Sequence, residues 1–216
     1  MIKNLLLVVS LMMLFISYIR IILIYLKTKN KRIANITGFD LAKEIASNYE
    51  EINVVESKEI AISKYNLKRN IIKLTSKNYE ENDIFTLTIS DCLSGYSLAN
   101  INQNKYLKLL SKITSNIDYL PKSSILTLII SILTTNIGDA KIGIILLGVI
   151  LIYQYILIQI NTESYQYSKE SLKKLISNEE LAKVEKVYLS LLSLHTISFI
   201  TTLILILREV LMIINI

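Results

Sequence analysis

The chain has 216 residues, of which 52% are hydrophobic, with a mean hydropathy of +0.46 and a net charge of +6. This composition excludes an ordinary soluble domain, because the apolar residues come in solid blocks rather than along periodic stripes. The single cysteine, Cys92, excludes an internal disulfide framework and fits a reducing compartment. With only five Gly and one Pro, the chain is expected to form long uninterrupted helices.

Four apolar blocks are candidates for crossing a bilayer, which takes roughly 20 residues for a hydrocarbon core about 30 Å thick. They cover residues 5–26, 123–137, 142–160 and 187–207. The second block is short, so it can cross the bilayer only if residues 119–121 extend it or if the membrane is locally thin. Residues 138–141 are predicted to be the turn of a helical hairpin between the second and third blocks. The alternative is a buried soluble hairpin, but nothing else in the chain is large enough to bury it.

The first block has features of both a signal peptide and a membrane anchor. Lys3 precedes an apolar stretch, as in a secretory signal. The block ends without the small residues that a cleavage site requires, so an uncleaved anchor is predicted. Arg20 lies near the end of this block, where its guanidinium can reach the headgroups.

The basic residues predict the orientation in the membrane. Residues 27–122 contain 15 of the 24 Lys and Arg, and residues 161–186 contain five more. The positive-inside rule therefore predicts a multi-pass protein of the cell membrane, with 27–120 and 161–186 in the cytoplasm and both termini outside. The lipid bilayer is then the partner that the sequence predicts. The positive charge follows from topology, and no nucleic-acid partner is predicted.

The segment 27–120 combines helical and strand patterns. Thr37 is a candidate cap for a helix at 38–46, and residues 66–70 are a candidate turn. Further helices are expected at 83–99 and 105–117. Short β-branched runs predict strands at 52–55, 60–62 and 71–74.

The predicted fold is an α+β membrane protein, mainly α, with four transmembrane helices. Its predicted parts are a transmembrane anchor, a cytoplasmic α+β unit, a transmembrane hairpin, a cytoplasmic amphipathic helix segment and a final transmembrane helix. In the same order, these parts cover residues 1–26, 27–120, 121–160, 161–186 and 187–216. The sequence predicts no oligomeric state.

Several stretches resemble one family in the same order along the chain. Residues 35–38 (N-I-T-G) match a G-L-T-G-like helix start, and residues 63–75 match a D-H-Y-D-P-R-x-K-x-L-R-L-S stretch. Residues 83–86 align with S-I-A-A, which places residues 92–96 (C-L-S-G-Y) on an H-E-x-G-H motif. A membrane hairpin, a V-E-F-D-A-S-like segment and a final span follow. The chain resembles the bacterial integral-membrane neutral zinc metallopeptidase family, in a degenerate form, which implies a small zincin-like helix–strand–helix unit.

The resemblance implies that the catalytic groups have been replaced. Cys92 stands at the first histidine ligand, Leu93 at the glutamate base and Tyr96 at the second histidine ligand, while Gly95 is retained with a structural role. The third ligand falls on Ser164, or on Glu163 after a shift of one residue. In the 63–75 stretch, Lys64 also stands where the family has a histidine. Zinc is the family's cofactor, and none is predicted for this chain.

The preferred interpretation is a pseudo-peptidase that binds a peptide or a membrane protein between an edge strand near 60–75 and the 83–99 helix. One alternative is an active metallopeptidase in which Cys92, Glu163 and a water or Tyr96 hold the metal. A further alternative is a small transporter or channel component. Its polar stripe would come from the few polar residues of the last two blocks, which are Gln154, Gln159, His195, Thr196, Thr201 and Thr202.

Three residues near these motifs have simpler interpretations. Asp91 is expected to be a solvated aspartate on a helix face. Cys92 is expected to be an inert packing residue, because residues 27–120 contain no histidine to activate it. His195 is expected to face the interior of the helix bundle and to form a hydrogen bond there.

Overall fold

The computed structural model describes residues 2–29, 31–33, 36–47, 52–58 and 62–214. The chain is mainly helical with one small sheet, and it divides into two compact units. We call residues 1–22, 120–158 and 193–216 the helical unit, and residues 23–119 and 159–192 the mixed unit.

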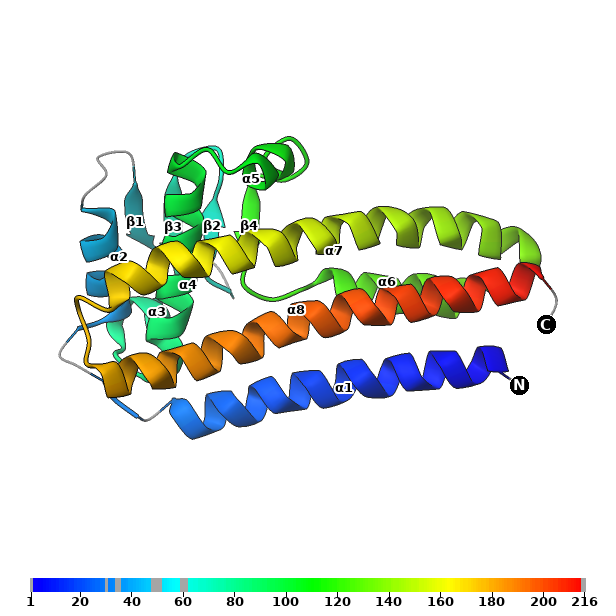
Figure 1. Cartoon of the computed structure of the whole chain (residues 1–216), viewed down its shortest axis with the longest axis horizontal. Helices are drawn as coiled ribbons and strands as arrows, with labels where there is room; N and C mark the ends of the chain where they lie inside the picture. The colour runs from blue at the N-terminus through cyan, green and yellow to red at the C-terminus, as the bar shows by residue number, and fades with distance from the viewer. Residues whose placement is uncertain (1, 30, 34–35, 48–51, 59–61, 215–216) are drawn as a thin grey trace. The chain divides into compact units, whose positions relative to one another are not determined.

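Four helices contribute to the helical unit: α1 (Ile2–Thr28), α6 (Ser123–Leu133), α7 (Ile137–Leu172) and α8 (Asn178–Ile213) (Figure 1). Of these, α1, α7 and α8 are long and apolar enough to cross a membrane. The predicted association with a membrane is supported on this ground. By contrast, α6 has 11 residues and rises only about 16 Å, less than a hydrocarbon core. The described residues thus contain three helices of membrane length where four were predicted.

The connection between α6 and α7 differs from the predicted turn. Asn136 Oδ1 accepts a hydrogen bond from the Asp139 backbone N–H at 3.0 Å, and Asn136 Nδ2 donates to Asp139 Oδ2 at 2.8 Å. This reciprocal capping starts α7 at Ile137. The prediction of a turn at 138–141 is therefore wrong, since these residues lie in the first turns of α7.

The segment 161–186, predicted as an amphipathic helix segment, belongs to two long helices. Its first part continues α7 as far as Leu172, and its last part begins α8 at Asn178. Neither Gly nor Pro follows Gly148, so nothing in the sequence forces α7 to end where the apolar block ends. Ser177 and Glu180 form the capping box that starts α8.

Polar side chains of the helical unit bond to one another across the helices. Gln154 Nε2 donates to Ser198 Oγ at 2.9 Å and to Ser123 Oγ at 3.3 Å, while Thr202 Oγ1 donates to Gln154 Oε1 at 2.8 Å. Interhelical bonds of this kind stabilise helix association in a membrane. Gln154 and Thr202 of the predicted polar stripe therefore take part in helix packing.

The sheet of the mixed unit has four strands in the order β1-β3-β2-β4. Strand β1 pairs parallel with β3, and the other pairs are antiparallel. The predicted strand 71–74 is confirmed, 52–55 is shifted by one residue, and residues 60–61 lie outside the described residues. The strands are β1 (Asn53–Glu56), β2 (Lys64–Asn66), β3 (Ile71–Leu74) and β4 (Asn116–Asp118).

Two predictions about this sheet are wrong. Strands β2 and β3 are its inner strands, so the stretch 60–75 does not supply the edge; β1 and β4 do. The predicted helix 105–117 ends early, because α5 (Lys105–Leu110) is followed by a turn and then by β4. Pairing of Asn116 with Asn66 and of Ile117 with Tyr65 overrides the local helical pattern.

The turn predicted at 66–70 joins β2 to β3. Asn66 Oδ1 accepts hydrogen bonds from the backbone N–H groups of Lys68 and Arg69, at 3.2 and 3.0 Å. Asn70 has a φ of 50°, in the left-handed region that asparagine tolerates. Asn100 Nδ2 donates to Asn70 Oδ1 at 2.7 Å and so ties the turn to a helix.

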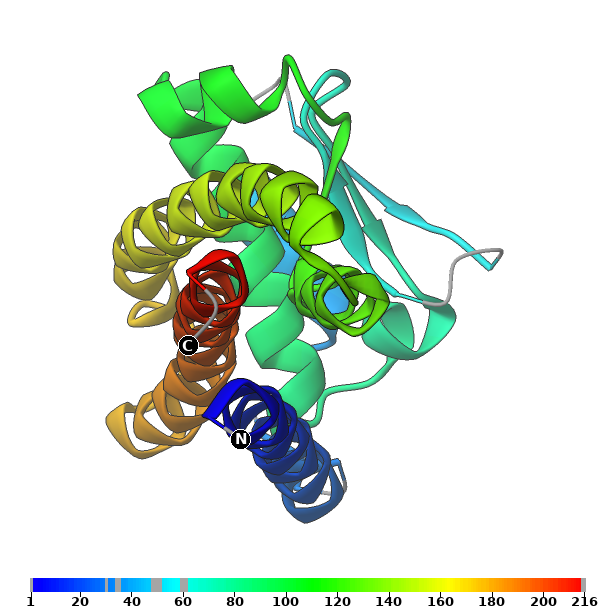
Figure 2. The ribbon, with the colours of Figure 1, turned by 90° about the vertical axis from the view of Figure 1, so that its right-hand side faces the viewer.

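Helix α4 (Ile84–Ile101) is the centre of the mixed unit and lies against the sheet (Figure 2). The predicted helix at 38–46 is α2 (Gly38–Ala46), which packs on α4 and β1. Thr37 caps it as predicted, in a reciprocal pair with Asp40 whose hydrogen bonds lower the pKa of that carboxyl. A short helix that the sequence did not predict, α3 (Ser76–Glu80), follows β3.

Candidate functional site

The helix that bears the candidate motif is capped firmly and buried on every side. Asp83 Oδ1 accepts the backbone N–H groups of Phe85 and Thr86 at 2.9 and 3.1 Å, and Thr86 Oγ1 donates to Asp83 Oδ2 at 2.9 Å. All side chains from Ile84 to Ala99 are buried. A helix that is apolar or small all round belongs to the interior of a protein. The motif positions are therefore held inside the mixed unit.

Three positions of the motif helix meet the part of α7 that belongs to the mixed unit. Gly95 lies against Ser164, since a Cβ on residue 95 would be 2.4 Å from the Ser164 carbonyl oxygen. Tyr96 is fully buried and its hydroxyl donates to Asn161 Oδ1. Asp91 Oδ2 accepts from Ser168 Oγ at 3.1 Å. Residues 91 and 95 are one turn apart, as are 164 and 168, so these contacts form one helix–helix seam.

The structure separates the two candidates for the third ligand. Ser164 is fully buried on the seam beside Gly95. Glu163 instead accepts a hydrogen bond from Asn104 Nδ2, just before α5. Cys92 and Glu163 therefore do not form a cluster of metal ligands. In the part of the chain that the structure describes, no three His, Cys, Asp or Glu side chains gather around one point.

Burial determines the protonation states of Cys92 and Asp91 on α4. It raises the pKa of the Cys92 thiol to about 12, despite a hydrogen bond with Tyr96, so the thiol is protonated at neutral pH. Burial also raises the pKa of Asp91 to about 7, against the effect of the Ser168 hydrogen bond. Asp91 is 0% exposed, so its expected solvated position is wrong. The expectation of a solvated helix face fails because the side chains of α4 from Ile84 to Ala99 are buried.

These side chains do not fit a zinc ion. Zinc in proteins is held by thiolates, imidazoles and carboxylates around a tetrahedral centre. The Cys92 thiol is protonated, the Tyr96 hydroxyl is bonded to Asn161, and Ser164 offers only a hydroxyl. Leu93 has no group that accepts a proton from water. Asp91 is the one carboxylate among the seam residues named here, and Ser168 already donates to it.

Other residues singled out from the sequence lie elsewhere. Lys64 lies on β2, in register with Lys73 of β3 and Asp118 of β4. His195 lies on α8 within the helical unit and is 3% exposed, as expected for a residue that faces the bundle interior.

The sequence interpretation missed Asn161, Ser168 and Tyr188. Tyr188 Oη donates to the Asn161 carbonyl oxygen, so Asn161 receives hydrogen bonds from α4 and α8. A signal was present, because Asn161, Ser164 and Ser168 recur at intervals of three and four residues on α7. This stripe of small polar residues marks the face of α7 that packs on α4.

The comparison with protein families covers nearly the whole chain. A family model described as "Putative neutral zinc metallopeptidase" matches residues 3–215. Searches of curated proteins and of solved structures found no match. The family resemblance deduced from the ordered motifs is thus confirmed, and the chain belongs to this neutral zinc metallopeptidase family.

Proposed function

We propose that this protein is a non-catalytic member of its family, a membrane-embedded pseudo-peptidase that binds a peptide or protein partner. One observation carries the proposal: the positions that match the zinc ligands and the base are buried, and Tyr96 and Ser164 among them lie in the helix–helix seam. Leu93 and Tyr96 are 0% exposed, and Gly95 has the Ser164 backbone in close contact. A metallopeptidase needs a metal with an open coordination position and a base beside its water. We infer that Ser164 occupies the third-ligand position, because it faces Gly95 while Glu163 bonds to Asn104.

The proposed topology keeps four crossings. Ser123 at the start of α6 lies beside Gln154, and the connection 134–136 leads directly into Ile137. Residues 137–154 of α7 rise about 26 Å along the helix axis. Because Ser123 lies beside Gln154, α6 and residues 134–136 together span a similar depth of the membrane. Together with the basic residues of 27–120 and 161–186, this supports a topology in which both termini lie outside the cytoplasm.

The proposed binding surface is the outer edge of β1. The backbone N–H groups of Asn53 and Ser57 donate to Asn70 and Leu74, on the side of β3. Because strand residues alternate, the backbone groups of Val54 and Glu56 point to the other side, where an extended peptide can add a strand. A groove of about 340 Å³ lies beside this edge. Its described lining residues are Phe39, Lys43, Ala46, Ser47, Ile52, Asn53 and Val54.

Metal analysis of the full chain tests the loss of catalysis. Protein purified in neutral detergent and dialysed against micromolar zinc is expected to retain no stoichiometric zinc and to cleave no peptide from a random library. The positive control restores the motif with Cys92→His, Leu93→Glu, Tyr96→His and Ser164→Glu, and it is expected to bind one zinc. One tightly held zinc in the unaltered chain, with cleavage that is lost in Cys92→Ala, would overturn the proposal.

Photocrosslinking in cells tests the binding surface. A photoreactive residue at Val55, whose side chain is exposed, is expected to give a discrete adduct, and the same residue at Lys68 in the β2–β3 turn is not. Val54→Pro removes an outward N–H and is expected to abolish the adduct. An adduct of equal yield from Lys68, or one that persists in Val54→Pro, excludes strand addition at β1.

A further inference from the structure

A second cavity of the mixed unit has a lining of different chemistry. Its volume is about 400 Å³, within the range of small-molecule sites. The described lining combines two lysines, three hydroxyl side chains, one amide and three aromatic rings. These residues are Tyr25, Lys58, Ile62, Ser63, Thr75, Ser76, Lys77, Asn78, Phe85 and Tyr119.

The charged side chains of the described lining are both basic. Lys58 and Lys77 supply two ammonium groups, and the described lining contains no Asp or Glu. A neighbouring cavity of about 440 Å³ differs, because Glu80, Glu81 and Asp83 offset Lys29 and Arg32 there. Ammonium groups in a lining of hydroxyls attract an anion, and a phosphate group accepts hydrogen bonds from both kinds of donor.

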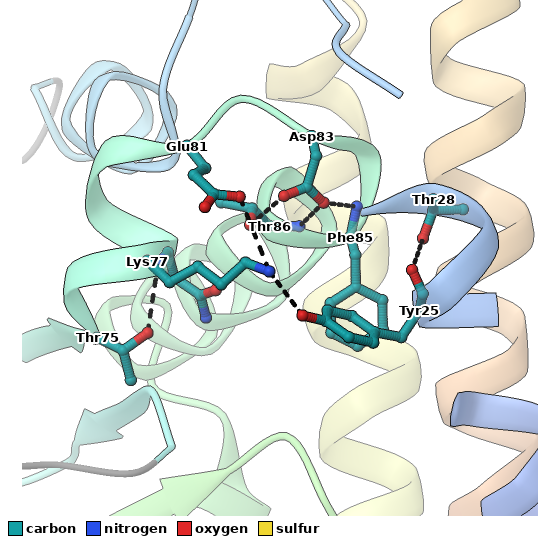
Figure 3. Close-up of polar contacts among 9 residues, drawn as sticks. Tyr25, Thr28, Thr75, Lys77, Glu81, Asp83, Phe85 and Thr86 are labelled. Atoms are coloured by element: carbon teal, nitrogen blue, oxygen red, sulfur yellow. Dashed lines mark hydrogen bonds and ion pairs between the residues drawn. The ribbon is translucent and has the colours of Figure 1, made fainter. Parts of the chain in front are cut away.

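Lys77 of this lining contacts Tyr25, which in turn packs against Phe85 (Figure 3). Its Nζ donates to Tyr25 Oη at 2.7 Å and lies 4.6 Å from the centre of the Tyr25 ring. The Tyr25 ring meets Phe85 edge to face, with centroids 5.2 Å apart. Glu81, outside the lining, is 3.8 Å from the same Nζ. Burial acts against the charged form of Lys77, but the hydrogen bond to Tyr25 and the charge of Glu81 outweigh it and raise the pKa of Lys77.

The cavity residues lie next to membrane segments in the chain. Tyr25 is one turn before the end of α1, a helix of membrane length, and Tyr119 lies four residues before α6. Tyrosines concentrate where membrane segments meet the headgroups, and lysines at that depth attract anionic lipids. The ring surfaces of Tyr25, Phe85 and Tyr119 also offer an apolar wall for the glycerol and upper acyl carbons.

We propose that this cavity binds the phosphate headgroup of an anionic phospholipid, with Lys58 and Lys77 on the phosphate and the aromatic rings against the adjoining apolar part. This site is independent of the seam of α4 and α7 and of the proposed loss of catalysis. Free phosphate shares the headgroup's chemistry, but it would leave the aromatic wall without a role.

Lipid titration followed by native mass spectrometry tests the proposal on the detergent-purified full chain. Dioctanoyl phosphatidylglycerol is expected to bind at least tenfold more tightly than dioctanoyl phosphatidylcholine. Replacing both lysines (Lys58→Gln with Lys77→Gln) is expected to weaken phosphatidylglycerol binding about 25-fold, at about fivefold for each lysine. The charge-preserving pair Lys58→Arg with Lys77→Arg is expected to retain binding, which separates loss of charge from misfolding.

A matched control removes two exposed lysines from elsewhere in the mixed unit. Lys68→Gln with Lys108→Gln has the same net charge as the test variant and is expected to bind phosphatidylglycerol within twofold of the unaltered chain. An equal loss in the control would mean that overall charge governs binding, and the proposal fails. It fails as well if inorganic phosphate displaces the lipid at similar concentrations, since the ligand would then be the free anion.

Discussion

Gly95 of α4 and Ser164 of α7 lie in such close contact that a Cβ on residue 95 would be 2.4 Å from the Ser164 carbonyl oxygen and 2.9 Å from its carbonyl carbon. Backbone atoms of a helix cannot move aside as the end of a flexible side chain can. Gly95 therefore has a packing role on α4, where its missing side chain allows the close approach of α7.

Substitution of this glycine tests the seam. Gly95→Ala is expected to destabilise the protein by about 1–3 kcal/mol, because the methyl group forces α4 and α7 apart. Thermal unfolding in neutral detergent, followed by circular dichroism, measures the loss. Gly148→Ala is the matched control, since a Cβ there meets nothing within 4 Å. It is expected to be neutral or slightly stabilising. Equal melting temperatures for the two variants would contradict the close contact.

Removing the Tyr96 hydroxyl tests the bond between α4 and Asn161. Tyr96→Phe deletes the donor to the buried Asn161 Oδ1 and is expected to cost about 1–3 kcal/mol in the free energy of unfolding. Tyr106→Phe, at a half-buried tyrosine of α5, controls for loss of a hydroxyl and is expected to change stability by less than about 0.5 kcal/mol. A ligand role for Tyr96 predicts a different result, namely a change in metal content with little change in stability.

Asp91 is expected to make stability depend on pH. Burial raises its pKa to about 7 in the folded chain, against about 3.9 in an unfolded chain. The folded state therefore holds its proton more tightly, and stability falls as pH rises from about 4 to about 7 and then levels off. The loss is expected to be on the order of a few kcal/mol.

Denaturant titrations at a series of pH values measure this dependence. Asp91→Asn is expected to remove most of the decline between pH 4 and 7. Glu44→Gln, which removes an exposed carboxylate of α2, is expected to leave it in place. If Asp91→Asn and the unaltered chain decline in parallel, another group is responsible.

The buried ion pair of the helical unit supports a fourth prediction. Arg208 Nη1 lies 2.6 Å from Glu209 Oε1 and donates to the Ser131 carbonyl oxygen at 2.8 Å; Arg208 is 7% exposed and Glu209 0%. Arg208→Met leaves a buried carboxylate without its cation and is expected to cost about 3–5 kcal/mol.

A double variant separates charge from packing at this pair. Arg208→Met with Glu209→Gln is expected to regain most of the stability lost in Arg208→Met, because no charge is then left unpaired. Arg20→Met, at an exposed arginine of α1, is the control and is expected to have little effect. Additive losses in the double variant would show that the pair is not coupled.

Local signals in the sequence predicted several elements well. The Thr37 cap, the Asn66 turn and the β3 strand depend on contacts within a few residues, and all three form as expected. Signals from hydropathy alone were less complete. They did not show that α7 begins at Ile137, where the Asn136–Asp139 cap prevails over the glycine that suggested a turn.

Long-range pairing could not be deduced in this way. The inner position of β2 depends on β4, whose Asn116 pairs with Asn66 from 50 residues farther along the chain, in a register that no local pattern encodes. Asp91 was expected to be solvated because a helix of this length ordinarily has an exposed face, and only the packing of α4 shows that it has none.

By itself, the sequence determined the membrane-length apolar segments and the family, because both depend on residue identity and order. Only the tertiary structure decided that Ser164 lies against Gly95 while Glu163 bonds to Asn104, and that Asp91 and Tyr96 form hydrogen bonds across the seam. The physical reason is that a shift of one residue turns a helical side chain by about 100°. Which of two neighbours faces α4 is therefore fixed by the packing of the helices and not by their composition.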